Sequence, residues 1–184
     1  MSQYTFHTVE SAPETARPIL QKAKETLGFV PSLYAGLANS PAALQAYLAL
    51  SDFFDKTSFS PIERQVVLLV VSAENGCEYC VAAHSFIAKK MAGVPDAVVS
   101  ALRERRAPED SKLAALASYT RVMVSERGWV ADHPALQAFL SAGYSQQQAL
   151  EVVVGVAQKT LSNYANHLLK TPLDAAFGSE RWTR

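Results

Sequence analysis

The sequence predicts an all-α fold, and three observations support this prediction. Proline and glycine residues fall mostly between the apolar segments and not inside them. This placement favours helices, because both residue types would interrupt a helix from within. Two of these segments begin with serine followed by proline, which is a typical helix start. No convincing pair of strands is found. With 184 residues, 49% of them hydrophobic, the chain can bury one substantial core, so we expect residues 1–184 to form a single domain.

Two start signals predict helices over residues 42–54 and from residue 62 to about residue 74. Ser40-Pro41 supplies an N-cap and a proline at the first helical position. Ser60-Pro61-Ile62-Glu63 repeats this start and adds a capping box, because the glutamate stands three residues after the cap. The second helix is apolar almost all round through Val66–Val71, so we expect it at the centre of the core. A buried strand is the alternative for this run, but the capping box and the length of the segment favour a helix.

The next helix is expected to begin close to Cys77, because Asn75-Gly76 is a typical helix end. It should run to about Met91, before Gly93 and Pro95. Four further helices are predicted over residues 95–105, 111–127, 134–142 and 145–170, the last one capped by Ser145 with Gln148 as its capping-box partner.

Both cysteines of the chain lie in the motif Cys77-Glu78-Tyr79-Cys80-Val81-Ala82-Ala83-His84. A helix advances about 100° per residue, so Cys77, Cys80 and His84 fall within an arc of roughly 60° on one face. Cys80 and His84 are neighbours on consecutive turns, and an imidazole beside a thiol can accept its proton to give the reactive thiolate. The free N–H groups of the helix start favour a thiolate at Cys77 as well. The spacing therefore predicts a dithiol redox site.

Two other interpretations of the motif are inert packing in the core and a zinc site. A lone cysteine or histidine is usually a packed core residue, but three such residues at this spacing favour chemistry. A structural zinc site needs four protein ligands, and residues 85–89 after His84 supply none. His133 or His167 would have to provide a ligand through the tertiary fold, so no metal is expected.

Composition argues against several classes of partner. Lysine plus arginine number 17 and aspartate plus glutamate number 17, so no electrostatic capture of nucleic acid or of an anionic membrane is expected. Residues 1–10 are polar and lack the apolar core of a signal peptide. The longest apolar run, residues 66–71, is too short to span a bilayer. We therefore expect a cytoplasmic protein, where a C-x-x-C motif is more often catalytic than structural.

The segment Val71-Ser72-Ala73-Glu74-Asn75-Gly76-Cys77-Glu78-Tyr79-Cys80-Val81-Ala82-Ala83-His84 resembles the V-S-x-x-N-x-C-x-x-C-x-x-x-H signature of AhpD-like alkylhydroperoxidases. These form a branch of the carboxymuconolactone decarboxylase superfamily. Residues 28–33 and 38–41 resemble the N-terminal segment of the family, and residues 161–167 and 171–174 resemble the C-terminal helix of its peroxidase-related subgroup. Decarboxylases of the superfamily generally lack the cysteine pair, which favours redox chemistry here.

This resemblance implies an AhpD-like multi-helix bundle with the C-x-x-C at the start of a core helix, assembled into trimers or hexamers. It also implies an enzyme, a thiol-dependent peroxidase in which Cys80 attacks a hydroperoxide, His84 accepts its proton and Cys77 closes the disulfide. An external dithiol (a lipoyl group, thioredoxin or a peroxiredoxin-linked system) would then reduce the disulfide, with no tightly bound organic cofactor. The residues alone leave the order of attack open, because the helix start also activates Cys77.

One position departs from the family pattern, which places a glutamate twelve residues before the first cysteine. Here that residue is Gln65, whose amide can orient an imidazole but cannot accept a proton as a carboxylate does. Glu63 lies on another side of its helix, and Glu74, three residues before Cys77, is the candidate substitute. The change is expected to slow peroxidase turnover or to shift activity toward disulfide reduction.

Three other functions stay open at this stage. The same dithiol suits a disulfide reductase or redox adaptor. A lyase or decarboxylase of the wider superfamily would use neither cysteine. A metal-binding or purely oligomeric interaction module is the third alternative.

Overall fold

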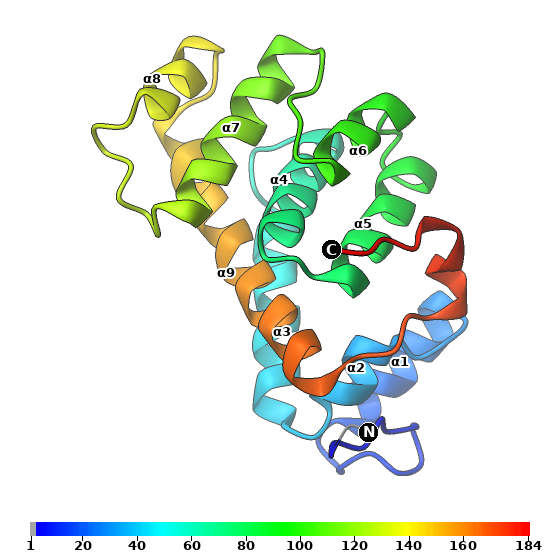
Figure 1. The fold of residues 1–184 in the computed structure, drawn as a ribbon. Coiled ribbons are helices and arrows are strands. Elements are labelled where there is room, and N and C mark those ends of the chain that lie inside the picture. Colours follow the sequence, from blue (N-terminus) through cyan, green and yellow to red (C-terminus); the bar gives the residue numbers. More distant parts are fainter. Residues whose placement is uncertain (1–2) are drawn as a thin grey trace.

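The computed structural model describes residues 3–184. These residues contain nine α-helices and one short 3-10 helix, joined by turns and irregular segments (Figure 1). No strand occurs within these residues, so the all-α prediction is confirmed. The helices are α1 (Arg17–Leu27), α2 (Ser32–Leu37), α3 (Pro41–Asp55), α4 (Pro61–Glu74), α5 (Glu78–Lys90), α6 (Asp96–Arg103), α7 (Ser111–Ser125), α8 (Pro134–Ser141), α9 (Gln146–Leu169) and η1 (Ala175–Glu180).

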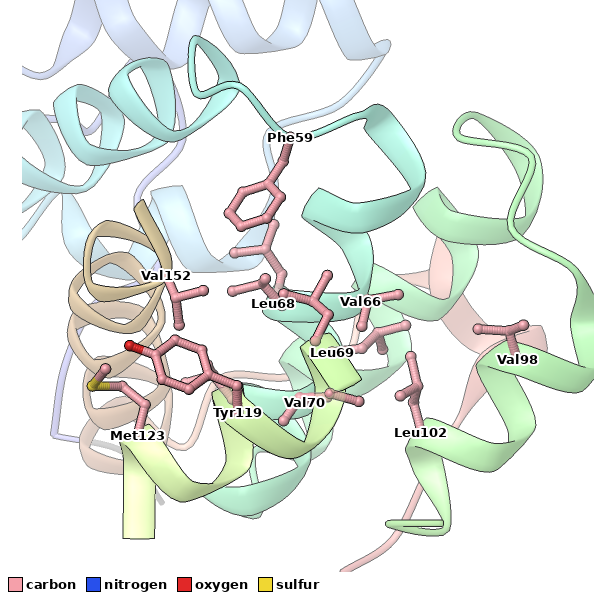
Figure 2. Close-up of a cluster of buried hydrophobic side chains, with 14 of the residues drawn as sticks. Phe59, Val66, Leu68, Leu69, Val70, Val98, Leu102, Tyr119, Met123 and Val152 are labelled. Atoms are coloured by element: carbon pink, nitrogen blue, oxygen red, sulfur yellow. The ribbon is translucent and has the colours of Figure 1, made fainter. Parts of the chain in front are cut away.

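Helix α4 lies at the centre of the molecule, as its apolar sequence predicts. It packs against α5, α6, α7 and α9, and its residues 66–71 are all buried. Figure 2 shows side chains of α4 such as Leu69 and Val70 meeting Tyr119 of α7, Leu102 of α6 and Val152 of α9. Residues 66–71 are thus buried on every side of the helix, which is why this stretch is entirely apolar.

The helix starts follow the predicted capping signals. The Ser60 hydroxyl accepts from the Glu63 N–H, and the Glu63 carboxylate accepts from the Ser60 N–H at 2.9 Å. Ser145 and Gln148 form the same reciprocal pair at the start of α9. Each capping box satisfies two N–H groups that the first helical turn leaves free.

The structure adds two N-terminal helices that the sequence analysis did not predict, α1 and α2. Helix α1 buries only Leu20 and Ala23 and is polar over most of its length, so few apolar residues mark it in the sequence. Helix α2 has six residues, which is too short for a periodic signal. Both helices contribute residues to the lining of the cavity described below.

A close approach of α9 to α3 and α4 places the C-terminal helix across the site. It occurs at Gly155, where a Cβ atom would lie 2.8 Å from both Phe54 Cε2 and Val67 Cγ1. Only glycine allows the backbone of α9 to come this near. The residues of α9 that follow, from Gln158 onward, thereby reach α5.

Residues 171–184, which we name the C-terminal strap, run from the end of α9 past α2 and then beside α5 (Figure 1). The strap is irregular except for η1. No helix within residues 3–184 has both the length and the apolar character needed to cross a membrane.

Candidate functional site

The turn between α4 and α5 places the cysteines. Asn75 ends α4, and Gly76 adopts a left-handed backbone with φ of +66°, a conformation that favours glycine. The chain then enters α5 with Cys77 as its N-cap residue, as the sequence predicts, and the Cys77 N–H donates to the Ser72 carbonyl at 2.9 Å. Cys80 follows in the first turn of α5.

Both cysteines are free thiols in the interior of the protein, each 1% exposed. The Asn166 side-chain amide donates to the Cys80 sulfur at 3.2 Å and lies 3.8 Å from the Cys77 sulfur. The Ser162 hydroxyl lies 3.9 Å from the Cys80 sulfur. Two polar side chains of α9 therefore converge on Cys80, and one of them also reaches Cys77.

His84 lies one turn beyond Cys80 and is held from two sides. Its Nε2 is 2.9 Å from the Lys159 Nζ, and its Nδ1 is 3.1 Å from the Gln65 Oε1. Because an ammonium group only donates, Nε2 accepts from Lys159, and Nδ1–H donates to Gln65. Burial and the neighbouring Lys159 charge hold the pKa of His84 well below its usual range, so the imidazole is neutral.

The two thiols have opposite electrostatic environments. Burial by itself raises the pKa of Cys80, but a hydrogen bond from the Cys77 thiol, the Lys159 ammonium and the Ser162 hydroxyl together hold that pKa well below its ordinary value. The hydrogen bond with Cys80, followed by burial, raises the pKa of Cys77. These surroundings favour the thiolate at Cys80 and the protonated thiol at Cys77.

The predicted site residues fall into two groups in the structure. Cys77, Cys80, His84 and Gln65 lie together, with the Gln65 amide as the direct partner of His84. The Nδ1 atom of His84 bonds to Gln65, and its Nε2 atom bonds to Lys159. Among the described residues, no hydrogen bond joins His84 directly to Cys80. Glu74 forms an ion pair with Arg121 of α7 at 2.8 Å, so its carboxylate is engaged away from the thiols.

The polar face of α9 is the part of the site that sequence reasoning missed. Gln158, Lys159, Ser162 and Asn166 are all buried on this helix. They recur at helical spacing within a segment that is otherwise largely apolar on its inward side, and this buried polar pattern is the signal that points to a site.

A cavity of about 580 Å³ opens in front of Cys80. Cys80, His84, Lys159, Gln65 and Gln158 form its polar inner end. Cys77 is not among the residues that line it, so an incoming molecule meets Cys80 first. The aromatic residues that line the rest of the cavity are Phe29, Tyr34, Tyr47, Tyr79, Phe86 and Phe177.

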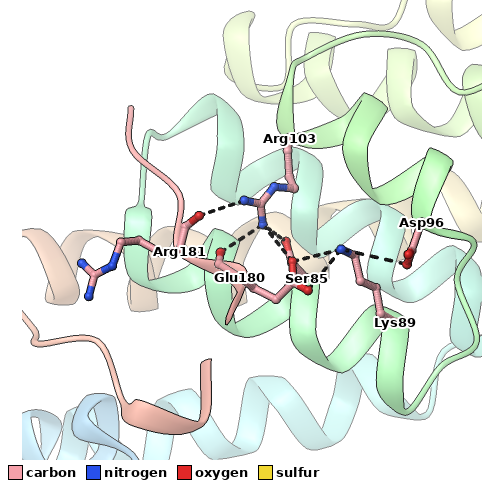
Figure 3. A network of polar contacts seen from close by, with 6 residues as sticks. All are labelled: Ser85, Lys89, Asp96, Arg103, Glu180 and Arg181. Atoms are coloured by element: carbon pink, nitrogen blue, oxygen red, sulfur yellow. Dashed lines mark hydrogen bonds and ion pairs between the residues drawn. The ribbon is translucent and has the colours of Figure 1, made fainter. Parts of the chain in front are cut away.

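The C-terminal strap forms one wall of this cavity and is attached at several points, two of which flank Phe177. At its start, the Asp174 carboxylate accepts from the Ser32 hydroxyl and from the Tyr79 hydroxyl, both at 2.6 Å. At the other end, Figure 3 shows Glu180 between Lys89 and Arg103, with the Lys89 ammonium 3.1 Å from both carboxylate oxygens.

Phe177 lies between these two attachments. Its ring packs against those of Tyr79, Phe86 and Phe29 at centroid distances of 6.1, 5.7 and 6.1 Å. Tyr79 therefore contacts the strap twice, through its hydroxyl at Asp174 and through its ring at Phe177. No group of three or more histidine, cysteine, aspartate or glutamate side chains suited to a metal ion occurs within residues 3–184.

The lowered pKa of Cys80 predicts reactivity below the pH at which ordinary thiols ionise. At pH 7, iodoacetamide should alkylate Cys80 of the native protein at least about tenfold faster than it alkylates a peptide thiol, which is only a few per cent thiolate. The rate should fall only as the pH drops through the native pKa. Mass spectrometry of the Cys77→Ser variant across a pH series measures this, and a rate that rises only above about pH 8 would contradict it.

Residues 41–121 match the profile of the carboxymuconolactone decarboxylase family. No curated protein sequence matches the chain significantly.

Several solved structures share the fold over nearly the whole chain. A peroxidase-related protein from Ralstonia eutropha JMP134, described as an alkylhydroperoxidase AhpD core, is 21% identical with a TM-score of 0.84, over 100% of this chain and 98% of that one. A peroxidase-related protein from Silicibacter sp. TM1040 is 20% identical with a TM-score of 0.79, over 97% and 96% of the two chains. The debrominase Bmp8, whose cysteine-to-alanine variant was solved with 2,3,4-tribromopyrrole, is 18% identical with a TM-score of 0.79, over 98% and 96%.

Proposed function

Residues 41–121 match the carboxymuconolactone decarboxylase family and the whole chain has the AhpD-like fold, and from this premise we propose that it is a thiol-dependent peroxidase. One observation carries the proposal. A buried free thiol, Cys80, lines a cavity together with Lys159 and His84, its surroundings lower its pKa, and a second free thiol, Cys77, lies three residues before it and does not line the cavity. Such a pair suits attack on a small electrophile followed by disulfide closure.

The reaction begins when the Cys80 thiolate attacks the distal oxygen of a hydroperoxide in the cavity. The O–O bond breaks, Cys80 becomes a sulfenic acid, and the alcohol departs. Cys77 then attacks the Cys80 sulfur, hydroxide leaves as water after protonation, and a Cys77–Cys80 disulfide forms. An external dithiol restores both thiols by exchange.

The proposed electron donor is a dithiol of the lipoyl, thioredoxin or peroxiredoxin-linked kind, and the proposed assembly is a trimer or hexamer. Exposed apolar side chains along the outer face of α9 support self-association. They are Leu150, Val153, Tyr164 and Leu168, and water-exposed apolar side chains gathered on one helix face are typical of subunit contacts.

The test is the loss of free thiols after an organic hydroperoxide is added to the fully reduced protein. Both thiols should disappear within seconds at micromolar protein, with one equivalent of alcohol formed and an intramolecular disulfide detected by mass spectrometry. Thiols that persist for minutes would remove the peroxidase proposal. Fast exchange of the same protein with small disulfides would then favour a disulfide reductase.

The debrominase with a similar fold suggests a second electrophile for the same assay. The aromatic lining of the cavity suits a flat halogenated ring. If 2,3,4-tribromopyrrole consumes the thiols with release of bromide while the hydroperoxide does not, reductive dehalogenation replaces peroxide reduction as the function.

A further inference from the structure

Lys159 is a buried ammonium group without a carboxylate partner. Its side chain is 1% exposed, although it lines the inner end of the cavity. None of the ion pairs within residues 3–184 includes it. A buried charge without compensation strongly destabilises a folded protein, so an anion is needed next to Lys159.

The Cys80 sulfur supplies this anion. Lys159 and Cys80 line the same end of the cavity, and Lys159 bonds to His84, which lies one turn beyond Cys80 on α5. Ser162, on the next turn of α9 after Lys159, lies 3.9 Å from the Cys80 sulfur. At this position the positive charge of Lys159 lowers the pKa of Cys80 and favours the thiolate. The ammonium and the thiolate form a buried pair whose net charge is zero. Each group therefore makes the charged form of the other tolerable inside the protein.

His84 and Gln65 hold Lys159 in place. The Gln65 Oε1 can only accept, so it fixes the proton of the imidazole on Nδ1 and leaves the Nε2 lone pair for Lys159 at 2.9 Å. A carboxylate at position 65 would instead favour the imidazolium, whose Nε2–H would face the ammonium. Glutamine at this position is thus matched to a lysine opposite His84.

We infer that Lys159 is a catalytic proton carrier in this site, which balances the charge of the Cys80 thiolate and then protonates the departing alkoxide. His84 and Gln65 are positioning residues that act through it. The inference rests on the proposed function for the identity of the leaving group. The pairing of Lys159 with the thiolate stands without it.

The proton inventory closes over one oxidation. Cys80–S⁻ and ROOH give Cys80–SOH and RO⁻, and Lys159–NH₃⁺ converts RO⁻ to ROH. The neutral amine then takes the Cys77 proton, Cys77–S⁻ displaces hydroxide from Cys80–SOH to form the disulfide, and the same lysine proton converts hydroxide to water. The products are a disulfide, an alcohol, water and a neutral Lys159, so the site holds no unpaired charge in either redox state.

Other ionisable groups surround this pair. Cys77 and His84 face it from α5 and Tyr47 faces it from α3, while the Cys80 charge also influences Tyr79. Burial holds the pKa of Tyr47 and Tyr79 above the usual range. Because His84 is neutral and both tyrosines stay protonated, the thiolate signal of the native site at neutral pH reports on Cys80.

The experiment compares Lys159→Met, Lys159→Arg and, as a matched surface control, Lys22→Met, since Lys22 is exposed on α1. The ultraviolet absorbance of the thiolate is titrated against pH in each reduced protein, and hydroperoxide-driven thiol loss is timed in parallel. Lys159→Met should lose the neutral-pH thiolate signal and react about 100-fold more slowly at pH 7. Raising the pH should recover much of this loss.

Lys159→Arg separates the two roles of the lysine. It should keep the thiolate signal, since the positive charge remains, but react at least about tenfold more slowly, because a guanidinium does not give up its proton.

Lys22→Met should match the unmodified protein in both measurements. A folded Lys159→Met variant with an unchanged titration would overturn the inference, as would full-speed reaction of Lys159→Arg. If the unmodified protein ignores hydroperoxides while its titration still depends on Lys159, the peroxidase proposal fails and the thiolate pairing holds.

Discussion

Replacing Cys80 with serine is expected to slow hydroperoxide reduction by about a thousandfold or more, because the variant loses the nucleophile that faces the cavity. Replacing Cys77 with serine should have a different result. The serine hydroxyl can still donate a hydrogen bond to Cys80, so the first attack persists, but no disulfide can close. The Cys77→Ser protein should therefore consume one equivalent of hydroperoxide and stop as a sulfenic acid.

Dimedone labelling followed by mass spectrometry measures both variants in one experiment. The label should appear on the Cys77→Ser protein and not on the Cys80→Ser protein. Each variant serves as the control for the other, because both retain one buried thiol. A sulfenic acid found on Cys77 in the Cys80→Ser protein would reverse the order of attack proposed above.

The largest expected effect on stability comes from Phe54, near the end of α3. Its ring is 0% exposed and lies directly against the backbone of α9 at Gly155. Replacing it with alanine should lower the free energy of unfolding by about 3–5 kcal/mol, since the cavity left between α3, α4 and α9 cannot fully collapse. Urea denaturation of the reduced protein measures this change.

The neighbouring residue Phe53 provides a matched control. It has the same side chain on the same helix but is 62% exposed. Phe53→Ala should therefore change the free energy of unfolding by no more than about 0.5 kcal/mol. Equal midpoints for the two variants would show that α9 is not held against α3 through Phe54.

The helices that the sequence predicts correctly are those with chemical start and stop signals. Ser60 with Glu63 and Ser145 with Gln148 placed the starts of α4 and α9 to within one residue. The predicted end of α7 was two residues too late, because the helix stops at Ser125 and Arg127 already adopts a left-handed backbone. Sequence patterns therefore place a helix end accurately where a capping box marks it, and less accurately where no capping side chain does.

From the spacing of residues alone, the candidate site was predictable only where it lies on one contiguous segment, and Gln65 of α4 came from the family resemblance. Cys77, Cys80 and His84 share α5, so helical spacing alone predicts that they lie together. The i, i+4 spacing of Cys80 and His84 did not reveal the lysine that bonds to the imidazole. Lys159 reaches the site from a helix far along the chain through a packing contact at Gly155, and such tertiary contacts leave no local pattern in a sequence.

The depth of the thiols limits which molecules can exchange electrons with them. Both sulfurs lie at or behind the inner end of a cavity that the C-terminal strap walls on one side. A redox partner whose dithiol sits on a broad, rigid face would collide with the rim before its sulfur reached Cys80, unless the strap moved away. A dithiol carried at the tip of a slender, flexible arm can enter with the strap in place. The physical reach of the donor, more than its reduction potential, is therefore the first property by which candidate electron donors should be sorted.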